Sequence, residues 1–192
     1  MNFLLTLAWL IAIVYSTIPA YWLLVHPRIE WWRARNVRLA MVGPLWFLLW
    51  IVAGALTAPW RRAVFYTWPL MWAPGLLLIA VGFWIYSRAR IHFSADQILG
   101  RSELQPHAHE QRLHTTGIRA RVRHPYYLGH LCELLGWTLG TGLVVLYVLT
   151  GVAVVTGALM LRREDAELER RFGEPYRAYR QRVPAFLPRW RN

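Results

Sequence analysis

The sequence contains no lysine, a single cysteine and only ten acidic residues among its 192 positions. All 22 basic residues are therefore arginine, and the formal net charge is +12. The lone cysteine, Cys132, excludes a disulfide within the chain and a cysteine metal cluster. Charge is also missing from long stretches of a chain that is 56% hydrophobic. A soluble domain of this size would not tolerate such stretches, so the composition indicates a membrane protein.

Four uncharged apolar runs exceed the roughly 18 residues that suggest a membrane-spanning helix. They cover residues 1–25, 39–60, 63–87 and 134–161. We do not expect the first run to be a cleavable signal, because no basic segment precedes it and its apolar core is too long. The runs predict an integral membrane protein.

The distribution of arginine predicts the orientation of these spans. Four arginines follow the first run, at positions 28, 33, 35 and 38, whereas only Arg61 and Arg62 separate the second and third runs. Arginine-rich loops stay in the cytoplasm, so the N-terminus is expected outside. Residues 88–123, with seven arginines, then fall on the cytoplasmic side. The arginines sit beside apolar runs without a nucleic-acid motif, so we expect membrane lipids as partners and no nucleic acid.

The stretch from residue 126 to 161 is too long for one span and is expected to form a tight helical hairpin. Residues 138–142 (TLGTG) are the natural turn, because glycine accepts the backbone angles that close a helix. Beyond residue 161 we expect the helix to leave the membrane, to end at Gly173 and to be followed by a short helix carrying Tyr176 and Tyr179. The prediction is one all-α domain over residues 1–192, a polytopic membrane helical bundle of about five transmembrane helices with the C-terminus inside.

Two polar segments are candidates for chemistry, RHPYYLG at residues 123–129 and the pair Glu164 and Asp165. A helical hairpin would make them neighbours. Together they offer what a sulfonium cofactor with an amino-acid end needs: donors, acceptors and aromatic walls. The donors would be Arg123 and His124, the walls Tyr126 and Tyr127, and the acceptors Glu164 and Asp165. Pro125 suits the first helical position, which directs free amides toward an anionic group.

Each candidate also has a simpler interpretation. Arginine, histidine and tyrosine at a helix start often only anchor a membrane helix, and an acidic pair among arginines is often a solvated helix end. Glu133 lies about two turns into the same helix, on one face with His130, and ionisable groups within spans are functional candidates. It could polarise a substrate headgroup, accept a proton, or form an interhelical hydrogen bond. The histidine pair at 107 and 109 has no zinc-site spacing, so no metal is expected.

Three blocks in order resemble the isoprenylcysteine carboxyl methyltransferase family and its phospholipid methyltransferase relatives. They are RLHTTG at residues 112–117, VRHPYYLG at 122–129, and the tail from EDAEL to the second proline of VPAFLP at 164–188. The resemblance covers roughly residues 88–190 and implies S-adenosylmethionine as cofactor, held at the cytoplasmic end of a small helical bundle. On this basis residues 1–87 form three N-terminal spans and residues 88–192 form the cofactor-binding half.

The resemblance also implies cofactor contacts and a lipophilic methyl acceptor that arrives from the membrane. The candidate cofactor-binding residues are Gln111, Arg112, Leu113, His114, Arg119, His124, Pro125, Tyr126, Tyr127, Glu164 and Asp165. Arg119 stands where the prenylcysteine enzymes have tyrosine, and Met160 where they have an arginine for the substrate carboxylate. Candidate substrate residues are His130, Glu133, Arg162 and Arg163, and candidate catalytic residues are Arg123 and Glu133.

Two other functions remain open from the sequence. Membrane sterol reductases are similar in their C-terminal half, and the arginines near RHPYYLG could instead meet the phosphates of a nicotinamide cofactor. A non-enzymatic membrane protein that docks through its charged tail is the third interpretation. The exclusive use of arginine indicates a GC-rich genome, and we expect a bacterial inner membrane as the location.

Overall fold

The computed structural model describes residues 2–35, 39–90 and 113–186. Within these ranges the chain is helical apart from connecting loops and one isolated bridge between Val64 and Leu143. The helices are α1 (Asn2–Val25), α2 (Ile29–Ala34), α3 (Leu39–Thr57), α4 (Trp72–Ala89), α7 (Pro125–Thr141), α8 (Val144–Phe172) and α9 (Glu174–Arg182). The predicted all-α class is confirmed.

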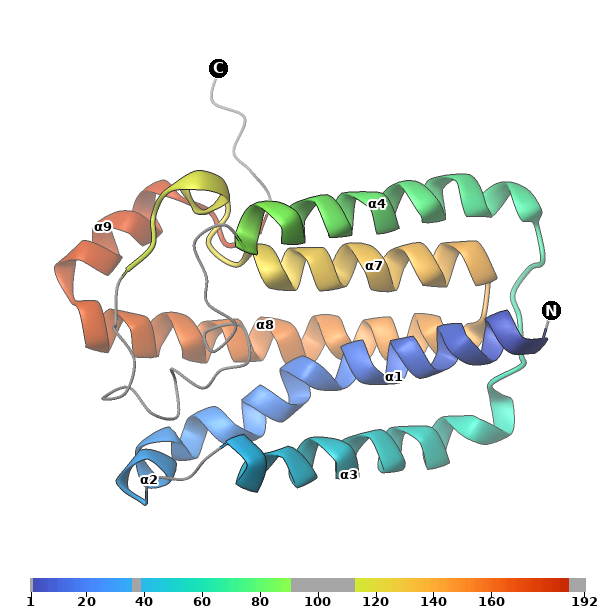
Figure 1. The fold of residues 1–192 in the computed structure, drawn as a ribbon, viewed down its shortest axis with the longest axis horizontal. Coiled ribbons are helices and arrows are strands. Elements are labelled where there is room, and N and C mark those ends of the chain that lie inside the picture. Colours follow the sequence, from blue (N-terminus) through green and yellow to red (C-terminus); the bar gives the residue numbers. More distant parts are fainter. Residues whose placement is uncertain (1, 36–38, 91–112, 187–192) are drawn as a thin grey trace.

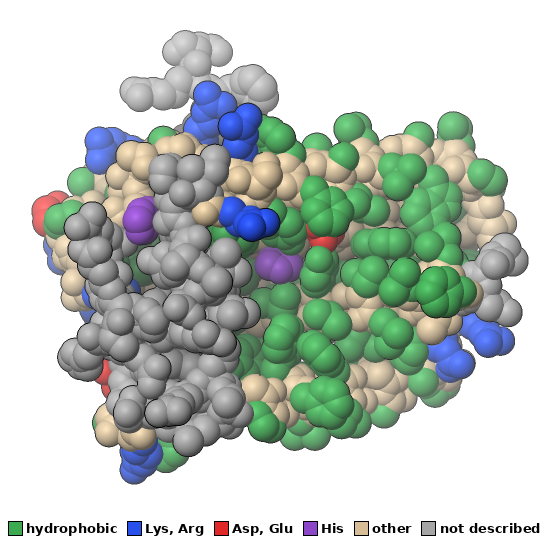
Figure 2. Space-filling model, in the orientation of Figure 1, with side chains coloured by type: hydrophobic (Ala, Val, Ile, Leu, Met, Phe, Trp, Pro, Cys, Tyr) green, Lys and Arg blue, Asp and Glu red, His purple; other side chains and the backbone are tan. Residues whose placement is uncertain are grey.

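The five long helices lie side by side and alternate in direction along the chain (Figure 1). At one end of the bundle lie α2, α9 and the 3-10 turn Gly117–Ala120, and at the other lies the connection from α3 to α4. Hydrophobic side chains cover the helical part of the face seen in Figure 2, and most arginines gather toward the two ends. This distribution matches a bundle whose sides meet lipid tails and whose ends meet water.

Four helical stretches are long and apolar enough to cross a membrane. They are Phe3–Trp32, Gly43–Trp60, Pro69–Ala89 and Val144–Phe172. The fifth predicted span corresponds to α7, whose 17 residues extend about 25 Å between α4 and α8, with eight of them buried. The protein is an integral membrane protein.

The turn between α7 and α8 lies at Gly142, inside the segment that the sequence marks as a turn. Gly142 has φ 65°, and a Cβ there would lie 2.4 Å from the carbonyl oxygen of Tyr66. The turn is fixed by hydrogen bonds from Phe65 N to Gly142 O (2.8 Å) and from Val144 N to Ala63 O (2.9 Å). Helix α4 therefore begins at Trp72, not near Ala63 as the hydrophobic run suggests, because residues 63–68 are used to hold the hairpin turn.

The close backbone approach of α7 is to α4, which the sequence did not predict. A Cβ at Gly136 would lie 2.6 Å from the carbonyl oxygen of Gly75, and one at Gly75 would lie 2.7 Å from that of Gly136. Small residues at a helix interface allow this approach in membranes, where van der Waals packing drives association. The pairing fixes α7 on both sides, against α4 and α8.

Helix α8 continues beyond its apolar part to Phe172 and then reverses. Gly173 ends it with φ 61°, and α9 follows directly. Tyr176, Tyr179 and Val183 form a small buried cluster on which Leu113, Leu168 and Phe172 pack. The predicted helix end and short tail helix are both confirmed, and they bring the tail back over the start of α7.

Candidate active site

The candidate site lies where the start of α7, the polar part of α8 and the segment after α9 meet. Arg123 N donates to the carbonyl of Pro184 (2.9 Å), and His124 N donates to that of Ala185 (3.2 Å). The hydroxyl of Tyr179 donates to the carbonyl of Arg119 (2.8 Å). The segment that precedes α7 is therefore held by the tail, which predicts that the site depends on α9.

Asp165 is the centre of this network. Its Oδ1 accepts from Arg123 Nη1 (2.7 Å), from His124 Nε2 (3.0 Å) and from the hydroxyl of Tyr176. The Arg123 side chain is only 9% exposed and that of Asp165 only 11%. A buried guanidinium requires such a partner, because an unpaired charge away from water is costly. Asp165 thus fixes the positions of Arg123 and His124.

Glu164, one residue earlier, faces the other side of the same imidazole. Its Oε2 lies 3.6 Å from His124 Nδ1, so the ring sits between two carboxylates. This oxygen is buried and accepts no hydrogen bond within the described part of the chain. Arg123 Nε is also buried, and it donates no hydrogen bond to a described residue. The site therefore offers one charged acceptor and one charged donor that form no hydrogen bond with a described residue.

The polar groups around this site are electrostatically perturbed. Burial raises the pKa of Tyr176, and its hydrogen bond to Asp165 raises it further. Burial likewise raises the pKa of Tyr179 to about 12. Burial lowers the pKa of Arg119, while Tyr126, Tyr179 and Glu164 act in the opposite direction. Tyr126 and Glu164 therefore both lie within electrostatic range of one guanidinium, as the hairpin hypothesis requires.

Aromatic rings continue from the site along α7. The ring of Tyr126 stacks on Tyr86 of α4 with centroids 6.0 Å apart, and the guanidinium carbon of Arg119 lies 5.8 Å from the Tyr126 centroid. The ring of Tyr127 lies 6.3 Å from that of His124. The two tyrosine rings thus lie against different groups: Tyr126 against Tyr86 of α4, and Tyr127 against His124.

A second polar group lies deeper in the bundle, around Glu133. This residue is 2% exposed, and its Oε1 accepts no hydrogen bond from the residues that the structure describes. Tyr15 of α1 and Tyr86 of α4 neighbour it, and His130 lies against both rings at 5.0 and 5.3 Å. His130 Nδ1 is 2.7 Å from the carbonyl of Tyr126. Because a carbonyl only accepts, Nδ1 carries the hydrogen, and in the neutral ring Nε2 keeps its lone pair.

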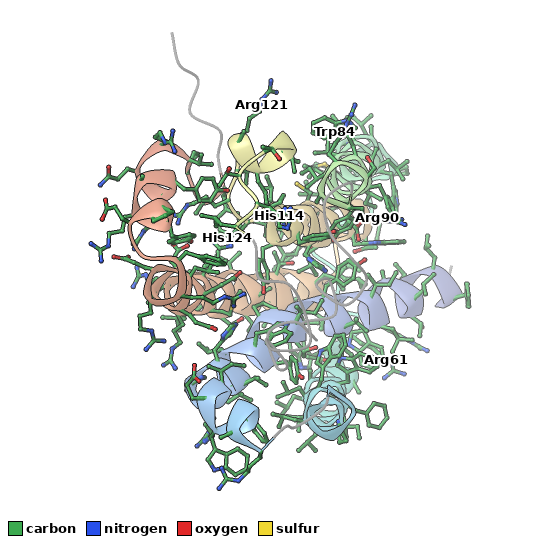
Figure 3. All side chains as sticks on the ribbon, turned by 60° about the vertical axis from the view of Figure 1, so that its left-hand side comes forward. Arg61, Trp84, Arg90, His114, Arg121 and His124 are labelled. Atoms are coloured by element: carbon green, nitrogen blue, oxygen red, sulfur yellow. The ribbon has the colours of Figure 1, made fainter. Side chains whose placement is uncertain are left out.

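The other predicted site residues fall in several places. Pro125 is the buried first residue of α7, and Leu113 packs on the tail cluster. Figure 3 shows His114 at the same end of the bundle as His124. Gln111 and Arg112 lie outside the described residues.

Both arginines that precede Glu164 are exposed. Arg163 lines a separate cavity with His26, away from Asp165. The predicted substrate contact of Arg162 and Arg163 stays a prediction.

Four residues near the site were not predicted from the sequence as site residues. Tyr176 and Tyr179 were expected only as residues of the tail helix, although their spacing of three already places them on one face. Tyr15 and Tyr86 come from helices whose packing against α7 no local pattern reveals.

One comparison with known proteins identifies a family. A family model described as phospholipid methyltransferase matches residues 70–175, a range that includes α4, α7, α8 and the Arg123–Asp165 network. No curated protein and no solved structure matches the chain. The family match favours the methyltransferase interpretation over the reductase and the non-enzymatic alternatives.

Proposed function

Because the chain belongs to the phospholipid methyltransferase family and is a membrane methyltransferase for lipid-like substrates, we propose that S-adenosylmethionine is its methyl donor and a lipid amine its acceptor. The observation that carries the proposal is a pair of buried polar atoms that have no hydrogen-bond partner among the described residues, Arg123 Nε and Glu164 Oε2. They flank His124 at the end of the bundle where the family match and the sequence motifs coincide.

The residues present fit the amino-acid end of this donor. Its carboxylate needs a cationic donor and its ammonium needs an anionic acceptor, and Arg123 Nε and Glu164 Oε2 supply one of each. Asp165 already accepts three hydrogen bonds inside the protein, so we assign it the task of positioning Arg123 and His124. The rings of Tyr126 and Tyr127 would provide walls for the rest of the molecule.

S-adenosylmethionine supplies an electrophilic methyl group on a sulfonium, and the protein contributes alignment and exclusion of water. Arg123 and Glu164 orient the donor, while the aromatic side chains of α7 and α4 exclude water and tolerate positive charge. No covalent intermediate with the enzyme is needed. The reaction therefore requires the protein to position the donor and the acceptor, and it requires no protein nucleophile.

The Glu133 group supports an amine as the acceptor. It lies about two turns, roughly 10 Å, from Tyr126 along α7 and so further into the membrane. A buried carboxylate ringed by Tyr15, Tyr86 and His130 favours a cationic headgroup and disfavours a carboxylate such as that of prenylcysteine. The lipid chains would then extend into the bilayer from a headgroup that meets the methyl donor near Tyr126.

An ammonium must lose a proton before it can attack a methyl group, and two groups are placed to accept it. His130 Nε2 carries the lone pair because Nδ1 donates to the Tyr126 carbonyl. Glu133 offers Oε1, which has no other donor among the described residues. We assign the proton acceptance to this pair.

The arginine distribution supports a cytoplasmic position for the site. Arg28, Arg35 and the arginines of α8 and α9 share its end of the bundle, whereas Arg61 and Arg62 mark the opposite end. By the positive-inside rule the N-terminus would be outside and the C-terminus in the cytoplasm.

Titration calorimetry of the detergent-purified protein with S-adenosylhomocysteine tests the donor. We expect binding by wild type and a loss of at least about tenfold in Glu164→Gln, because one charge-assisted contact is worth about 1.5 kcal/mol or more. Glu174→Gln on the exposed face of α9 is the matched control and should bind normally. Equal affinity of the two variants would refute the assignment of Glu164.

The acceptor is tested separately by methyl transfer to lipids that share acyl chains but carry an amine, a carboxylate or a thiol. We expect methyl transfer to the amine lipid. In Glu133→Gln the kcat for this lipid should fall far more than the affinity for S-adenosylhomocysteine. Transfer to the carboxylate lipid alone would overturn the amine assignment while leaving the donor assignment intact.

A further inference from the structure

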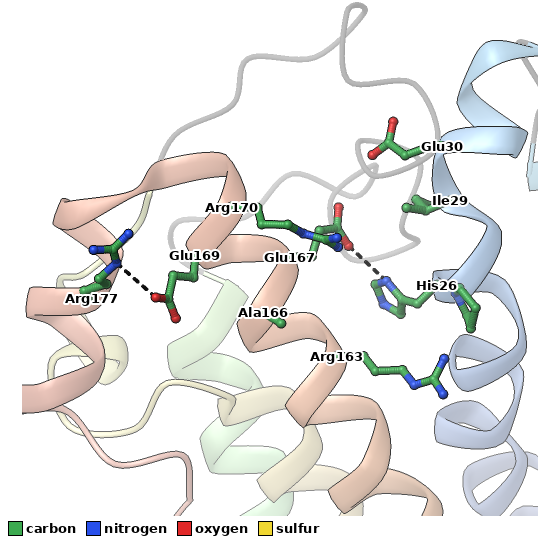
Figure 4. Close-up of a pocket in the computed structure, with 10 residues that line it drawn as sticks. His26, Ile29, Glu30, Arg163, Ala166, Glu167, Glu169, Arg170 and Arg177 are labelled. Atoms are coloured by element: carbon green, nitrogen blue, oxygen red, sulfur yellow. Dashed lines mark hydrogen bonds and ion pairs between the residues drawn. The ribbon is translucent and has the colours of Figure 1, made fainter.

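A second site lies on the other side of α8, between its polar part and the end of α1. A cavity of about 560 Å³ opens there, lined by the segment that follows α1, by α8 and by Arg177 of α9 (Figure 4). Its floor is fixed by a buried pair, His26 Nδ1 and Glu167 Oε2, 3.0 Å apart. The volume falls in the range of ligand-binding pockets and suffices for a lipid headgroup.

The cavity is lined by three arginines, Arg163, Arg170 and Arg177, and by three carboxylates, Glu30, Glu167 and Glu169. Arg177 pairs with Glu169 at 2.9 Å, and His26 pairs with Glu167. Arg163 and Arg170 form no salt bridge with any residue that the structure describes, and both are exposed. They lie two turns apart on α8, about 10 Å along the axis, with the small side chain of Ala166 between them. Both guanidinium groups can therefore reach one anionic group over Ala166.

The same face of α8 continues into the membrane as an exposed apolar stripe. Val152, Val155 and Leu159 are 46%, 60% and 45% exposed, and their spacing of three and four leads to Arg163, Ala166 and Arg170. The stripe ends where the uncharged run ends, at the depth of the headgroups. An amphiphile with an anionic head and acyl chains matches this sequence of surfaces.

We propose that this cavity binds the headgroup of an anionic phospholipid, with the phosphate between Arg163 and Arg170 and an acyl chain along Val152, Val155 and Leu159. Glu167 and Glu169 pair with His26 and Arg177, so the positive charge available to a ligand lies at Arg163 and Arg170. Basic groups between membrane helices on the cytoplasmic side attract anionic headgroups. The site is distinct from the proposed methyl donor site, because Asp165 and Glu164 point to His124 while Arg163 and Arg170 point to α1. It does not depend on the proposed methyl transfer.

The test measures the affinity of the full-length protein in neutral detergent for a fluorescent short-chain phosphatidylglycerol. Arg163→Gln/Arg170→Gln should weaken binding about 30-fold, which corresponds to about 1 kcal/mol for each arginine. The control Arg162→Gln/Arg171→Gln removes the same charge from the same helix outside the cavity and should change affinity less than about twofold. Arg163→Lys/Arg170→Lys keeps the charge and should retain most of the binding.

Three results would overturn the proposal. The first is an equal loss of phosphatidylglycerol affinity in the two double glutamine variants, which would indicate nonspecific attraction. The second is that phosphatidylcholine with the same acyl chains binds as tightly as phosphatidylglycerol. The third is full displacement of the lipid by glycerol phosphate or inorganic phosphate, which would indicate a site for a soluble anion. S-adenosylhomocysteine titrated into the same preparations checks the fold and keeps this result separate from that of the methyl donor site.

Discussion

Replacing Asp165 by asparagine tests the network that organises the candidate site. The change keeps the shape of the side chain and removes its charge. Arg123, whose side chain is 9% exposed, would then stay buried without an anion, and the three donors that bond Oδ1 would meet a neutral amide oxygen in place of a charged carboxylate. The folded state loses far more than one hydrogen bond.

The expected loss follows from the burial of the pair. Removing one partner of a buried, hydrogen-bonded ion pair costs about 3–5 kcal/mol, because the remaining charge is not compensated. For a protein of this length each kcal/mol lowers the melting temperature by about 2–4 °C. Asp165→Asn should therefore melt at least about 6 °C below wild type.

Thermal unfolding in detergent, followed by the fluorescence of the 12 tryptophans, measures this difference. The matched control is Glu174→Gln, which removes a carboxylate paired with Arg177 on the surface, where the two side chains are 76% and 54% exposed. Exposed pairs contribute about 0–1 kcal/mol, so the control should melt within about 4 °C of wild type. If Asp165→Asn and Glu174→Gln melt together, the description of Asp165 as the organising charge is refuted.

The helix packing and the tail provide two further predictions, both measured by the same melting assay. Gly136→Ala should destabilise by about 1–3 kcal/mol, because its methyl group would lie 2.6 Å from the carbonyl of Gly75, whereas Gly151→Ala, with no atom within 4 Å, should stabilise by up to about 1 kcal/mol. Similar effects of the two substitutions would contradict the close α4–α7 contact. Tyr179→Phe should cost about 1 kcal/mol through the lost hydrogen bond to the carbonyl of Arg119, and an unchanged melting temperature would show that this bond does not hold the tail.

The sequence was sufficient for the parts of the fold that depend on local chemistry. Uninterrupted apolar runs marked the membrane helices, Pro125 marked the first residue of α7, and the glycines at 142 and 173 marked two helix ends. Each of these signals acts through the backbone of a few neighbouring residues.

The sequence was not sufficient where distant segments meet. Residues 63–68 are apolar, yet they form a loop because their backbone bonds to the hairpin turn. The His26–Glu167 pair joins positions 141 residues apart, and no spacing rule connects them. The α4–α7 contact was missed for the same reason, since glycines spaced for close packing are also compatible with an ordinary lipid-facing helix.

Two consecutive residues of the candidate site show what the sequence predicted and what it did not. The motif pair predicted that Glu164 and Asp165 approach Arg123 and His124, but it assigned the two carboxylates one task. In the fold Asp165 accepts three hydrogen bonds from other residues of the chain. Glu164 Oε2 is buried but accepts none from the described residues. Successive residues on a helix point about 100° apart, so one faces the tail helix and the other does not.

This division explains why a donor site at the membrane edge can serve an acceptor from within the bilayer. The groups that hold the network, Asp165 and Tyr176, lie toward α9 and water, while Tyr126, His130 and Glu133 follow one another down α7 into the apolar part of the bundle. A polar headgroup that stops at Glu133 is about two helical turns from the proposed donor, and its chains need never leave the lipid. We propose that reach across those two turns, rather than affinity for water-soluble substrates, selects the acceptor.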